Sequence, residues 1–219
     1  MTRLYLVRHA QAQGNVEKTF QGSIDAPLSA LGMEQLERLA ERFADMPFDV
    51  IYSSPLSRAY QTAQAVNRAW GTEILVDPRF TEIDGGKFEG LAFDLLPRRF
   101  PEEFRLWTEE PWRFAAPEGE SMEQVFDRVK AGAEDVVRAN RGKTVVITSH
   151  GCALRNLVCA LKGWPLARIG EVEWLGNTSV TLAEYPDDRT PRLAFVGDDS
   201  HLTREMAEQS KPYFGGKRG

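Results

Sequence analysis

Five residues able to act in nucleophilic, acid–base or anion-binding chemistry stand at related places in the sequence. They are Arg8, His9, Arg58, Glu82 and His150. Arg8 and His9 follow a short apolar run, and His150 ends another. Arg58 lies in the first turn of a predicted helix behind a third apolar run, and Glu82 lies in a glycine-rich loop behind a fourth. Because ligands bind beyond the carboxyl ends of strands in α/β sheets, we expect these side chains to share one site.

Taken singly, each of these residues has a plainer interpretation. Either arginine could serve in a salt bridge, a histidine at a strand end is commonly structural, and Glu82 could be a solvated loop carboxylate. The chain has only three histidines, however, and two of them stand at predicted strand ends. A buried guanidinium also needs a negative partner. We therefore favour a shared site, and we interpret the third histidine, His201, as structural.

The chemistry that suits this set is phosphoryl transfer. Enzymes accelerate phosphate monoester hydrolysis by up to about 10²¹-fold. Two guanidinium groups stabilise the charge that spreads over the phosphoryl oxygens. A neutral imidazole can attack phosphorus to form a phosphohistidine, and a protonated carboxyl can give its proton to the leaving alkoxide. The sequence has no cluster of residues with metal-ligand spacing, so we expect no metal and no cofactor.

Alternating strand-like and helix-like segments must position these residues. Apolar runs predict strands at 4–7, 48–54, 73–77, 142–150, 179–186 and 192–197, the last two as a terminal pair. Helical spacing predicts helices at 27–46, 54–70, 121–139 and 152–164. Ser29 and Ser54 are predicted N-caps, and Ser121 with Gln124 has the spacing of a capping box. The pattern predicts an α/β fold with a mostly parallel central sheet and helices on both faces.

Residues 91–120 interrupt this alternation. The segment is rich in proline, glutamate and aromatic residues, which favours a helical capping insertion, or lid, over a sheet element. Its aromatic side chains could form an apolar wall over an organic leaving group, or could pack the lid helices together; they are Phe100, Phe104, Trp107, Trp112 and Phe114. We expect a single domain over residues 1–219 that carries this insertion.

The composition argues against several classes of partner. The net charge of −5 at pH 7 is unsuited to coating nucleic acid or an anionic membrane. No apolar run approaches the ~18 residues of a membrane span, and no charged-then-apolar leader is present, so we expect a cytoplasmic protein. Its partner would be a small phosphate ester, and the sequence leaves a homodimer open. Cys152 and Cys159 would lie ~10.5 Å apart along one helix, too far for a disulfide, which needs Cα atoms within ~7 Å.

The sequence around these residues resembles the histidine phosphatase superfamily, which has the phosphoglycerate mutase-like fold. The similar motifs occur in family order along most of the chain: LVRHAQAQGN, FQG, SSPLSRAYQTA, TEIDGGKFEG, SHGCALR, GNTSVT and VGDDSHL. A match in so many parts is specific, unlike a lone Arg-His pair. The resemblance implies a mixed sheet flanked by helices with a capping insertion, in agreement with the pattern of segments.

Carried over by position, the resemblance implies a role for each residue. His9 corresponds to the phosphorylated nucleophile, with Arg8 and Arg58 as phosphate clamps. His150 corresponds to a second histidine that donates to the phosphoryl oxygens, and Glu82 to the general acid and base. The resemblance implies three further substrate-binding residues, Asn15, Gln21 and Gly151.

One position departs from the family pattern. The usual motif is Arg-His-Gly, and this chain has Ala10 as the third residue. If that backbone needed a positive φ, alanine would cost about 1 kcal/mol or more. We expect an ordinary extended backbone there, so that the nucleophile is retained.

Within the superfamily, the insertion favours the broad-specificity phosphatase branch. Mutases of the family carry strongly basic inserts with a Trp-Arg-Arg-Ser stretch, whereas this insertion mixes four arginines with many glutamates and lacks that stretch. We expect a metal-independent phosphomonoesterase that acts on small phosphorylated metabolites through a phosphohistidine. A cofactor-dependent phosphoglycerate mutase and a phosphate-binding pseudoenzyme are the alternatives, and the leaving group is left open.

Overall fold

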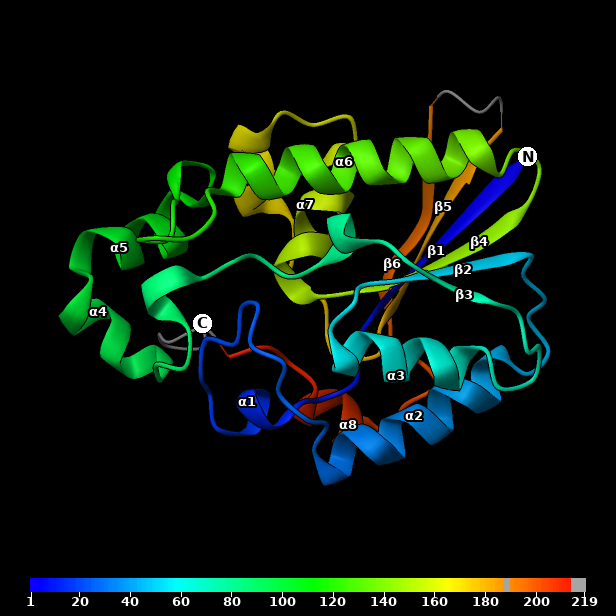
Figure 1. The fold of residues 1–219 in the computed structure, drawn as a ribbon, viewed down its shortest axis with the longest axis horizontal. Helices are drawn as coiled ribbons and strands as arrows, with labels where there is room; N and C mark the ends of the chain where they lie inside the picture. Colours follow the sequence, from blue (N-terminus) through cyan, green and yellow to red (C-terminus); the bar gives the residue numbers. More distant parts are fainter. Residues whose placement is uncertain (187–189, 214–219) are drawn as a thin grey trace.

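A six-stranded sheet in the order β3-β2-β4-β1-β5-β6 forms the centre of the protein (Figure 1). The structure is a computed structural model and describes residues 1–186 and 190–213. The strands are β1 (Thr2–Arg8), β2 (Val50–Ser53), β3 (Ile74–Val76), β4 (Thr144–Ser149), β5 (Val180–Tyr185) and β6 (Arg192–Asp198). The first four run parallel, β5 is antiparallel to β1, and β6 is antiparallel to β5. The predicted mostly parallel sheet is confirmed, and the predicted terminal pair forms its antiparallel edge.

Helices cover both faces of this sheet. They are α1 (Gln13–Val16), α2 (Ala30–Phe43), α3 (Ser57–Val66), α4 (Leu96–Arg99), α5 (Pro101–Glu109), α6 (Met122–Ala139), α7 (Gly151–Leu161) and α8 (Arg204–Gln209). Helices α2 and α3 lie on one face, and α6 and α7 lie on the other (Figure 1). The predicted helices are confirmed within a few residues of their expected ends.

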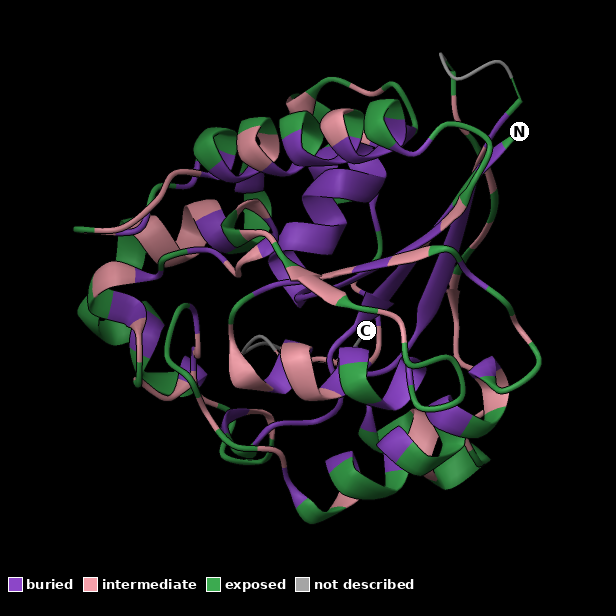
Figure 2. Ribbon diagram, turned by 45° about the vertical axis from the view of Figure 1, so that its right-hand side comes forward, coloured by how far each residue is buried: buried purple, intermediate pink, exposed green. Residues whose placement is uncertain are grey.

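The alternation of side chains along β1 explains why both faces are covered. Leu4 and Leu6 belong to the core cluster that includes α6 and α7, and Val7 belongs to the cluster that includes α2 and α3. Full burial of each such side chain stabilises the fold by roughly 1.5–3 kcal/mol. Figure 2 shows buried residues along the sheet and on the helix sides that face it.

Two of the three predicted helix caps are confirmed. The Ser29 hydroxyl accepts a hydrogen bond from the Gly32 amide at 3.0 Å at the start of α2. Ser121 and Gln124 form the predicted capping box of α6, with their two bonds at 3.2 and 2.7 Å. Local side chains therefore set where these two helices begin.

The predicted cap at Ser54 is wrong. Helix α3 begins at Ser57, and Asp25 from a distant loop accepts hydrogen bonds from the Ser57 amide at 2.8 Å and its hydroxyl at 2.7 Å. Ser54 directly follows β2, and its amide donates to the Thr148 carbonyl at 3.0 Å. Its hydroxyl lies 2.7 Å from Nε2 of His150. Ser54 therefore contacts His150 instead of capping α3.

The insertion at 91–120 is helical, as predicted, with α4, α5 and a 3-10 turn at Pro111–Arg113. Its aromatic residues mainly pack the insertion onto the core and onto one another. Phe100 lies 5.2 Å from Phe88 between ring centroids, and Phe114 lies 4.9 Å from Trp107. Of the five aromatic residues considered, only Trp107 lines the cavity described below. The packing interpretation therefore holds for most of them.

Sheet register brings distant segments to one edge. Arg8 pairs with Ser149, and Ser53 pairs with Thr148, so β1, β2 and β4 end side by side. Strand β5 is antiparallel and begins at the same edge, where Val180 pairs with Val7. The residues after β1, β2 and β4 and the loop before β5 therefore meet, as the rule for parallel sheets predicts.

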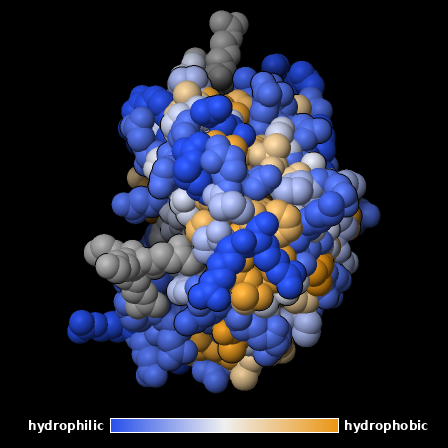
Figure 3. Space-filling view, turned by 90° about the vertical axis from the view of Figure 1, so that its left-hand side faces the viewer, coloured by the Kyte–Doolittle hydropathy of each residue, from blue (hydrophilic) through white to orange (hydrophobic). Residues whose placement is uncertain are grey.

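The structure also bears on the cysteines, on membrane-spanning helices and on the surface of the insertion. Cys152 and Cys159 are both buried and free of disulfide bonds, as predicted. Among the described residues, no helix combines the length and the apolar character that crossing a membrane requires. The end of the molecule that carries α4 and α5 shows mostly hydrophilic residues with hydrophobic groups between them (Figure 3).

Candidate active site

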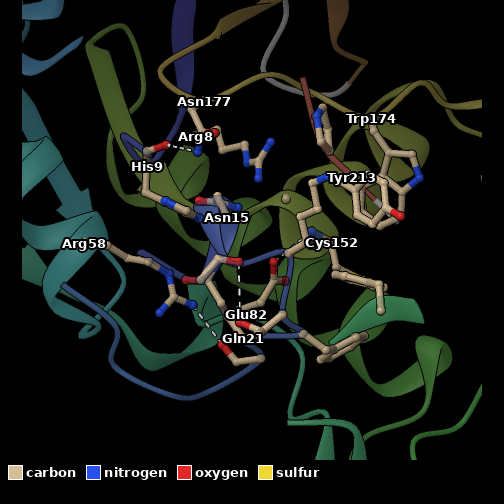
Figure 4. Close-up of a pocket in the computed structure, with 18 of the residues that line it drawn as sticks. Arg8, His9, Asn15, Gln21, Arg58, Glu82, Cys152, Trp174, Asn177 and Tyr213 are labelled. Carbon is tan, nitrogen blue, oxygen red and sulfur yellow. Dashed lines mark hydrogen bonds between the residues drawn. The ribbon is translucent and has the colours of Figure 1, made fainter. Parts of the chain in front are cut away.

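A cavity opens at the edge where β1, β2 and β4 end (Figure 4). The predicted site residues that line it are Arg8, His9, Asn15, Gln21, Arg58, Glu82 and Gly151. His150 is the predicted residue that does not line it: its side chain is fully buried, with its ring centroid 5.1 Å from that of His9. The structure therefore brings together side chains that lie far apart along the chain.

His9 is held in the tautomer that a nucleophile requires. Its Nδ1 lies 2.7 Å from the Ala10 carbonyl oxygen. A carbonyl can only accept, so Nδ1 carries the proton and Nε2 keeps its lone pair in the neutral ring. Burial, and then the positive charges of Arg58 and Arg8, hold the pKa of His9 well below its usual range. The ring is therefore neutral near pH 7 and available for attack through Nε2.

Arg8 offers an unpaired donor inside the protein. Its side chain is 4% exposed, and its Nη1 donates to the Leu175 carbonyl. Its buried Nε has no hydrogen-bond partner. Burial lowers the pKa of Arg8 to about 10, against the opposing effect of Glu82. A buried guanidinium with an unused donor is a strong site for an anion.

Arg58 is held by three hydrogen bonds and has further N–H groups that these bonds do not use. Its Nε donates to Nδ1 of His150 at 3.2 Å, and its two Nη atoms donate to the carbonyls of Ile24 and Gly22 at 2.5 and 2.8 Å. A guanidinium has five N–H groups, so two remain. Burial lowers the pKa of Arg58 from its usual value, and the nearby charge of Glu82 opposes this. The remaining donors can bind an oxyanion.

The contacts of His150 fix its tautomer. Because Arg58 can only donate, Nδ1 of His150 accepts, and Nε2 carries the proton toward the Ser54 hydroxyl at 2.7 Å. Burial, followed by the charge of Arg58, holds the pKa of His150 well below its usual range. In this structure His150 accepts a hydrogen bond from Arg58 and does not face the cavity. To donate to a phosphoryl oxygen, its Nε2–H group would have to break its contact with Ser54.

The first turn of α7 holds Glu82. One carboxylate oxygen accepts from the amides of Ile83 and Ala153, and the other accepts from the amide of Cys152, each at 3.0 Å. Helix N-terminal amides favour a negative group. These contacts fix the carboxyl at the cavity wall, which is a requirement for directed proton transfer.

Asn15 and Gln21 add neutral polar groups to the same wall. Oδ1 of Asn15 accepts from the Ala12 amide at 2.9 Å, which leaves its NH₂ group for a ligand. The buried Oε1 of Gln21 has no partner. Because the last torsion of a glutamine is soft and nearly two-fold, the amide can turn its NH₂ group to the same place.

The Ala10 backbone does not have the positive φ that would strain an alanine. The described non-glycine residues with positive φ are Lys18, Glu118 and Thr178, so Ala10 has no strained backbone. Its amide donates to the Thr62 hydroxyl at 3.0 Å. Across the described residues, no group of three or more histidine, cysteine or acidic side chains is placed to hold a metal ion.

The loop before β5 holds the backbone of Arg8 and His9, and this role was not predicted. The side-chain amide of Asn177 donates to the His9 carbonyl at 3.0 Å. The amide of Thr178 lies 3.1 Å from the Arg8 carbonyl and 3.3 Å from that of His9. Thr178 has φ +55°, a conformation that costs on the order of 1–3 kcal/mol outside glycine. The GNTSVT motif was the available signal, since it precedes a strand expected beside β1.

Two further aromatic residues line the cavity without having been predicted. Trp174 and Tyr213 form part of the wall. The Lys18 ammonium lies 4.5 Å from the centre of the Tyr213 ring, and the Tyr213 hydroxyl donates to Asp94 at 2.7 Å. Neither residue belongs to a periodic pattern in the sequence. Isolated aromatic residues occur in many roles, so the sequence offers no reason to assign them to the site.

Comparisons with known proteins agree with this geometry. The family model described as "Histidine phosphatase superfamily (branch 1)" matches residues 4–199. "Phosphoserine phosphatase 1" of Hydrogenobacter thermophilus is 39% identical over 168 residues, which are 77% of this chain and 80% of that protein. "Probable phosphoglycerate mutase GpmB" of Enterobacter sp. strain 638 is 34% identical over 217 residues, with 92% of this chain and 95% of that protein covered.

The solved structure of Bacillus stearothermophilus YhfR is similar in fold, with a TM-score of 0.87 and 33% identity. The alignment covers 92% of this chain and 99% of that one. The family model and the relatives agree with the motifs found in the sequence. The chain therefore belongs to the histidine phosphatase superfamily, branch 1.

Proposed function

We propose that this protein is a metal-independent phosphomonoesterase that acts through a phosphohistidine. The observation that carries the proposal is the neutral His9 ring, with its Nδ1 proton fixed on Ala10 and its Nε2 at a cavity lined by Arg8 and Arg58. This arrangement pairs a nucleophile with two cationic clamps. Membership of the family and the likeness to a phosphoserine phosphatase support the same reaction.

The reaction has two steps in this proposal. Nε2 of His9 attacks phosphorus, the P–O bond to the organic group breaks, and Glu82 gives its proton to the leaving oxygen. Water then gives a proton to Glu82 and attacks the phosphohistidine, which releases phosphate and restores neutral His9. Arg8 and Arg58 stabilise the charge on the phosphoryl oxygens in both steps. The remaining predicted residues complete phosphate binding: Asn15, Gln21, His150 and Gly151.

We propose further that the organic part of the substrate carries a negative group. Lys18 also lines the cavity, with its ammonium 4.5 Å from the centre of the Tyr213 ring. Lys211 also lines the cavity, but its ammonium is paired with Glu208 at 2.6 Å. Two relatives are named for phosphoserine and phosphoglycerate, whose organic parts each bear a carboxylate. Residues 91–120 would act as the lid of this single domain.

The mutase alternative has less support in the insertion. Arg105 pairs with Glu102 and Glu110, and Arg113 pairs with Glu110. Neither these two arginines nor Arg98 and Arg99 line the cavity. The insertion therefore lacks the free basic surface that a second phosphate would need at the cavity.

The test of the proposed function is a burst experiment. Mixing the protein with nitrophenyl phosphate should give a burst of nitrophenolate and a phosphoryl adduct on the peptide that contains His9. His9→Ala should lose both, and EDTA should leave the rate unchanged. Binding of phosphate without any release of nitrophenolate would identify a pseudoenzyme, and activity that EDTA removes and magnesium restores would contradict the metal-independent site.

The charge of the organic part is tested with matched substrates. 3-Phosphoglycerate and glycerol 3-phosphate differ by a carboxylate in place of a hydroxymethyl group. Lys18→Met should raise KM for 3-phosphoglycerate by about tenfold, the effect of one lost charge-assisted bond, and should leave glycerol 3-phosphate nearly unchanged. Lys130→Met, on a helix away from this cavity, is the control. Equal effects on both substrates would contradict the assignment of Lys18.

A further inference from the structure

A chain of hydrogen bonds runs from the outer helix α2 to the loop that holds the nucleophile. Arg42 donates from Nη2 to the Asp198 carboxylate at 2.6 Å, and its Nη1 lies 3.1 Å from Nδ1 of His201. Nε2 of His201 lies 3.2 Å from the Thr178 hydroxyl. That hydroxyl donates to the Asn177 carbonyl at 2.8 Å. The chain thus links surface residues to the segment beside His9.

The direction of every bond in this chain is fixed. A guanidinium can only donate, so Nδ1 of His201 accepts and its Nε2 carries the proton. The Nε2–H group therefore donates a hydrogen bond to the Thr178 hydroxyl, and this hydroxyl donates its own hydrogen bond to the Asn177 carbonyl. Burial and the charge of Arg42 lower the pKa of His201 to about 4, against the effect of Asp198. His201 thus stays neutral and keeps this one orientation near pH 7.

Thr178 is the link that needs support. It is fully buried and has φ +55°, although β-branched residues rarely take this conformation. In this conformation its amide reaches the carbonyls of Arg8 and His9. Relaxation of Thr178 to an ordinary backbone would move that amide and the neighbouring Asn177, which holds the His9 carbonyl.

We propose that His201 is a positioning residue for phosphoryl transfer. Its Nε2–H group donates to Thr178 and holds this residue in the left-handed conformation. Thr178 and Asn177 in turn bind the backbone of Arg8 and His9, and this backbone sets the position of the His9 ring at the cavity. This inference rests on the proposed phosphatase function. It assigns His201 a role beyond the structural one expected from the sequence.

The test uses four proteins: the wild type, His201→Ala, Thr178→Gly and the double variant. The measured quantities are the rate constant of the nitrophenolate burst and KM. His201→Ala should slow the burst on the order of tenfold, since misplacement of a reacting group by ~1 Å costs up to about 10²-fold, with KM changed less than about twofold. Glycine takes positive φ without strain, so His201→Ala should have little further effect in the Thr178→Gly background.

Two more variants separate positioning from loss of stability. His201→Gln keeps an N–H donor and should recover much of the burst rate. Thr203→Ala removes the N-cap of α8, whose hydroxyl accepts from the Met206 amide at 3.2 Å, and should lower the melting temperature without slowing the burst. Equal losses from His201→Ala in both backgrounds, or no loss in either, would overturn the proposal.

A readout independent of turnover keeps the two proposals distinguishable. The ¹⁵N shifts of the His9 ring should show a proton on Nδ1 in the wild type and in the double variant, and a mixture of tautomers in His201→Ala. Absence of any nitrophenolate release by the wild type, in a burst or in steady turnover, would refute the phosphatase function, while the ring shifts would still decide the role of His201. Unchanged shifts in His201→Ala would refute the positioning role.

Discussion

Arg58 donates a hydrogen bond from Nε to Nδ1 of His150 across 3.2 Å, so these two buried side chains form one hydrogen-bonded pair. The Ser54 hydroxyl holds the other side of the His150 ring at 2.7 Å. His150 thus helps to orient the guanidinium, whose two remaining N–H groups would bind phosphate in the proposed mechanism.

Arg58→Ala should lower the burst rate by on the order of 10²–10³, the effect of removing one donor to developing charge. Arg58→Lys should recover little, since one ammonium cannot replace the three bonds that fix the guanidinium. Arg68→Ala, which removes an exposed ion pair with Glu37, is the control and should keep the wild-type rate. Full activity of Arg58→Lys would show that charge alone suffices.

Glu82→Gln should affect substrates according to their leaving groups. The loss should be large for an alkyl phosphate, whose alkoxide needs a proton, and much smaller for nitrophenyl phosphate, whose anion is stable. Asp84→Asn changes an exposed carboxyl in the same loop that only accepts from the Gly86 amide at 2.9 Å, and it should leave both rates unchanged. Equal losses in Glu82→Gln would assign Glu82 to holding α7 and would make Glu89 or Asp84 the candidate for proton transfer.

Gly151→Ala should weaken phosphate binding without unfolding the protein. A Cβ at this position would lie 3.4 Å from Nε of Arg8, an ordinary contact that covers an unpaired donor. Loss of one charge-assisted bond predicts binding of inorganic phosphate weaker by about tenfold or more, measurable by calorimetry. Gly170→Ala, where the nearest atom would lie 3.9 Å away, is the control. Unchanged affinity in Gly151→Ala would show that Arg8 binds phosphate through another edge.

The buried histidines should make stability fall as the pH is lowered below about 6.5. Burial lowers the pKa of His9, His150 and His201 in the folded protein. Below pH 6.5 the unfolded chain therefore binds more protons than the folded chain, and the free energy of unfolding decreases. Each such proton contributes about 1.4 kcal/mol per pH unit.

Urea unfolding between pH 7 and 5 would measure this slope, above the range in which most carboxyls titrate. His201→Gln should reduce the slope by about one proton, because glutamine does not titrate. A flat profile would contradict neutral burial of the histidines. The acid limb of the activity profile should likewise lie below pH 6.5, since in the proposed mechanism His9 attacks only as the neutral ring.

The sequence by itself determined the repeated strand and helix pattern and most of the site. Local signals sufficed for the cap at Ser29 and the capping box at Ser121, because both depend on residues within one turn. Arg8, His9 and His150 could be placed at one edge because parallel strands end together. Their neighbours carried motifs specific enough to identify the family.

The tertiary structure alone decided which groups these side chains contact. Ser54 has the local features of a cap, yet it binds His150, because the sheet brings together residues that lie 96 positions apart. Thr178 and Tyr213 reach the site through strand pairing and the path of the C-terminal segment, and neither has a periodic pattern. Such non-local contacts depend on the packed fold as a whole, so no short stretch of sequence encodes them.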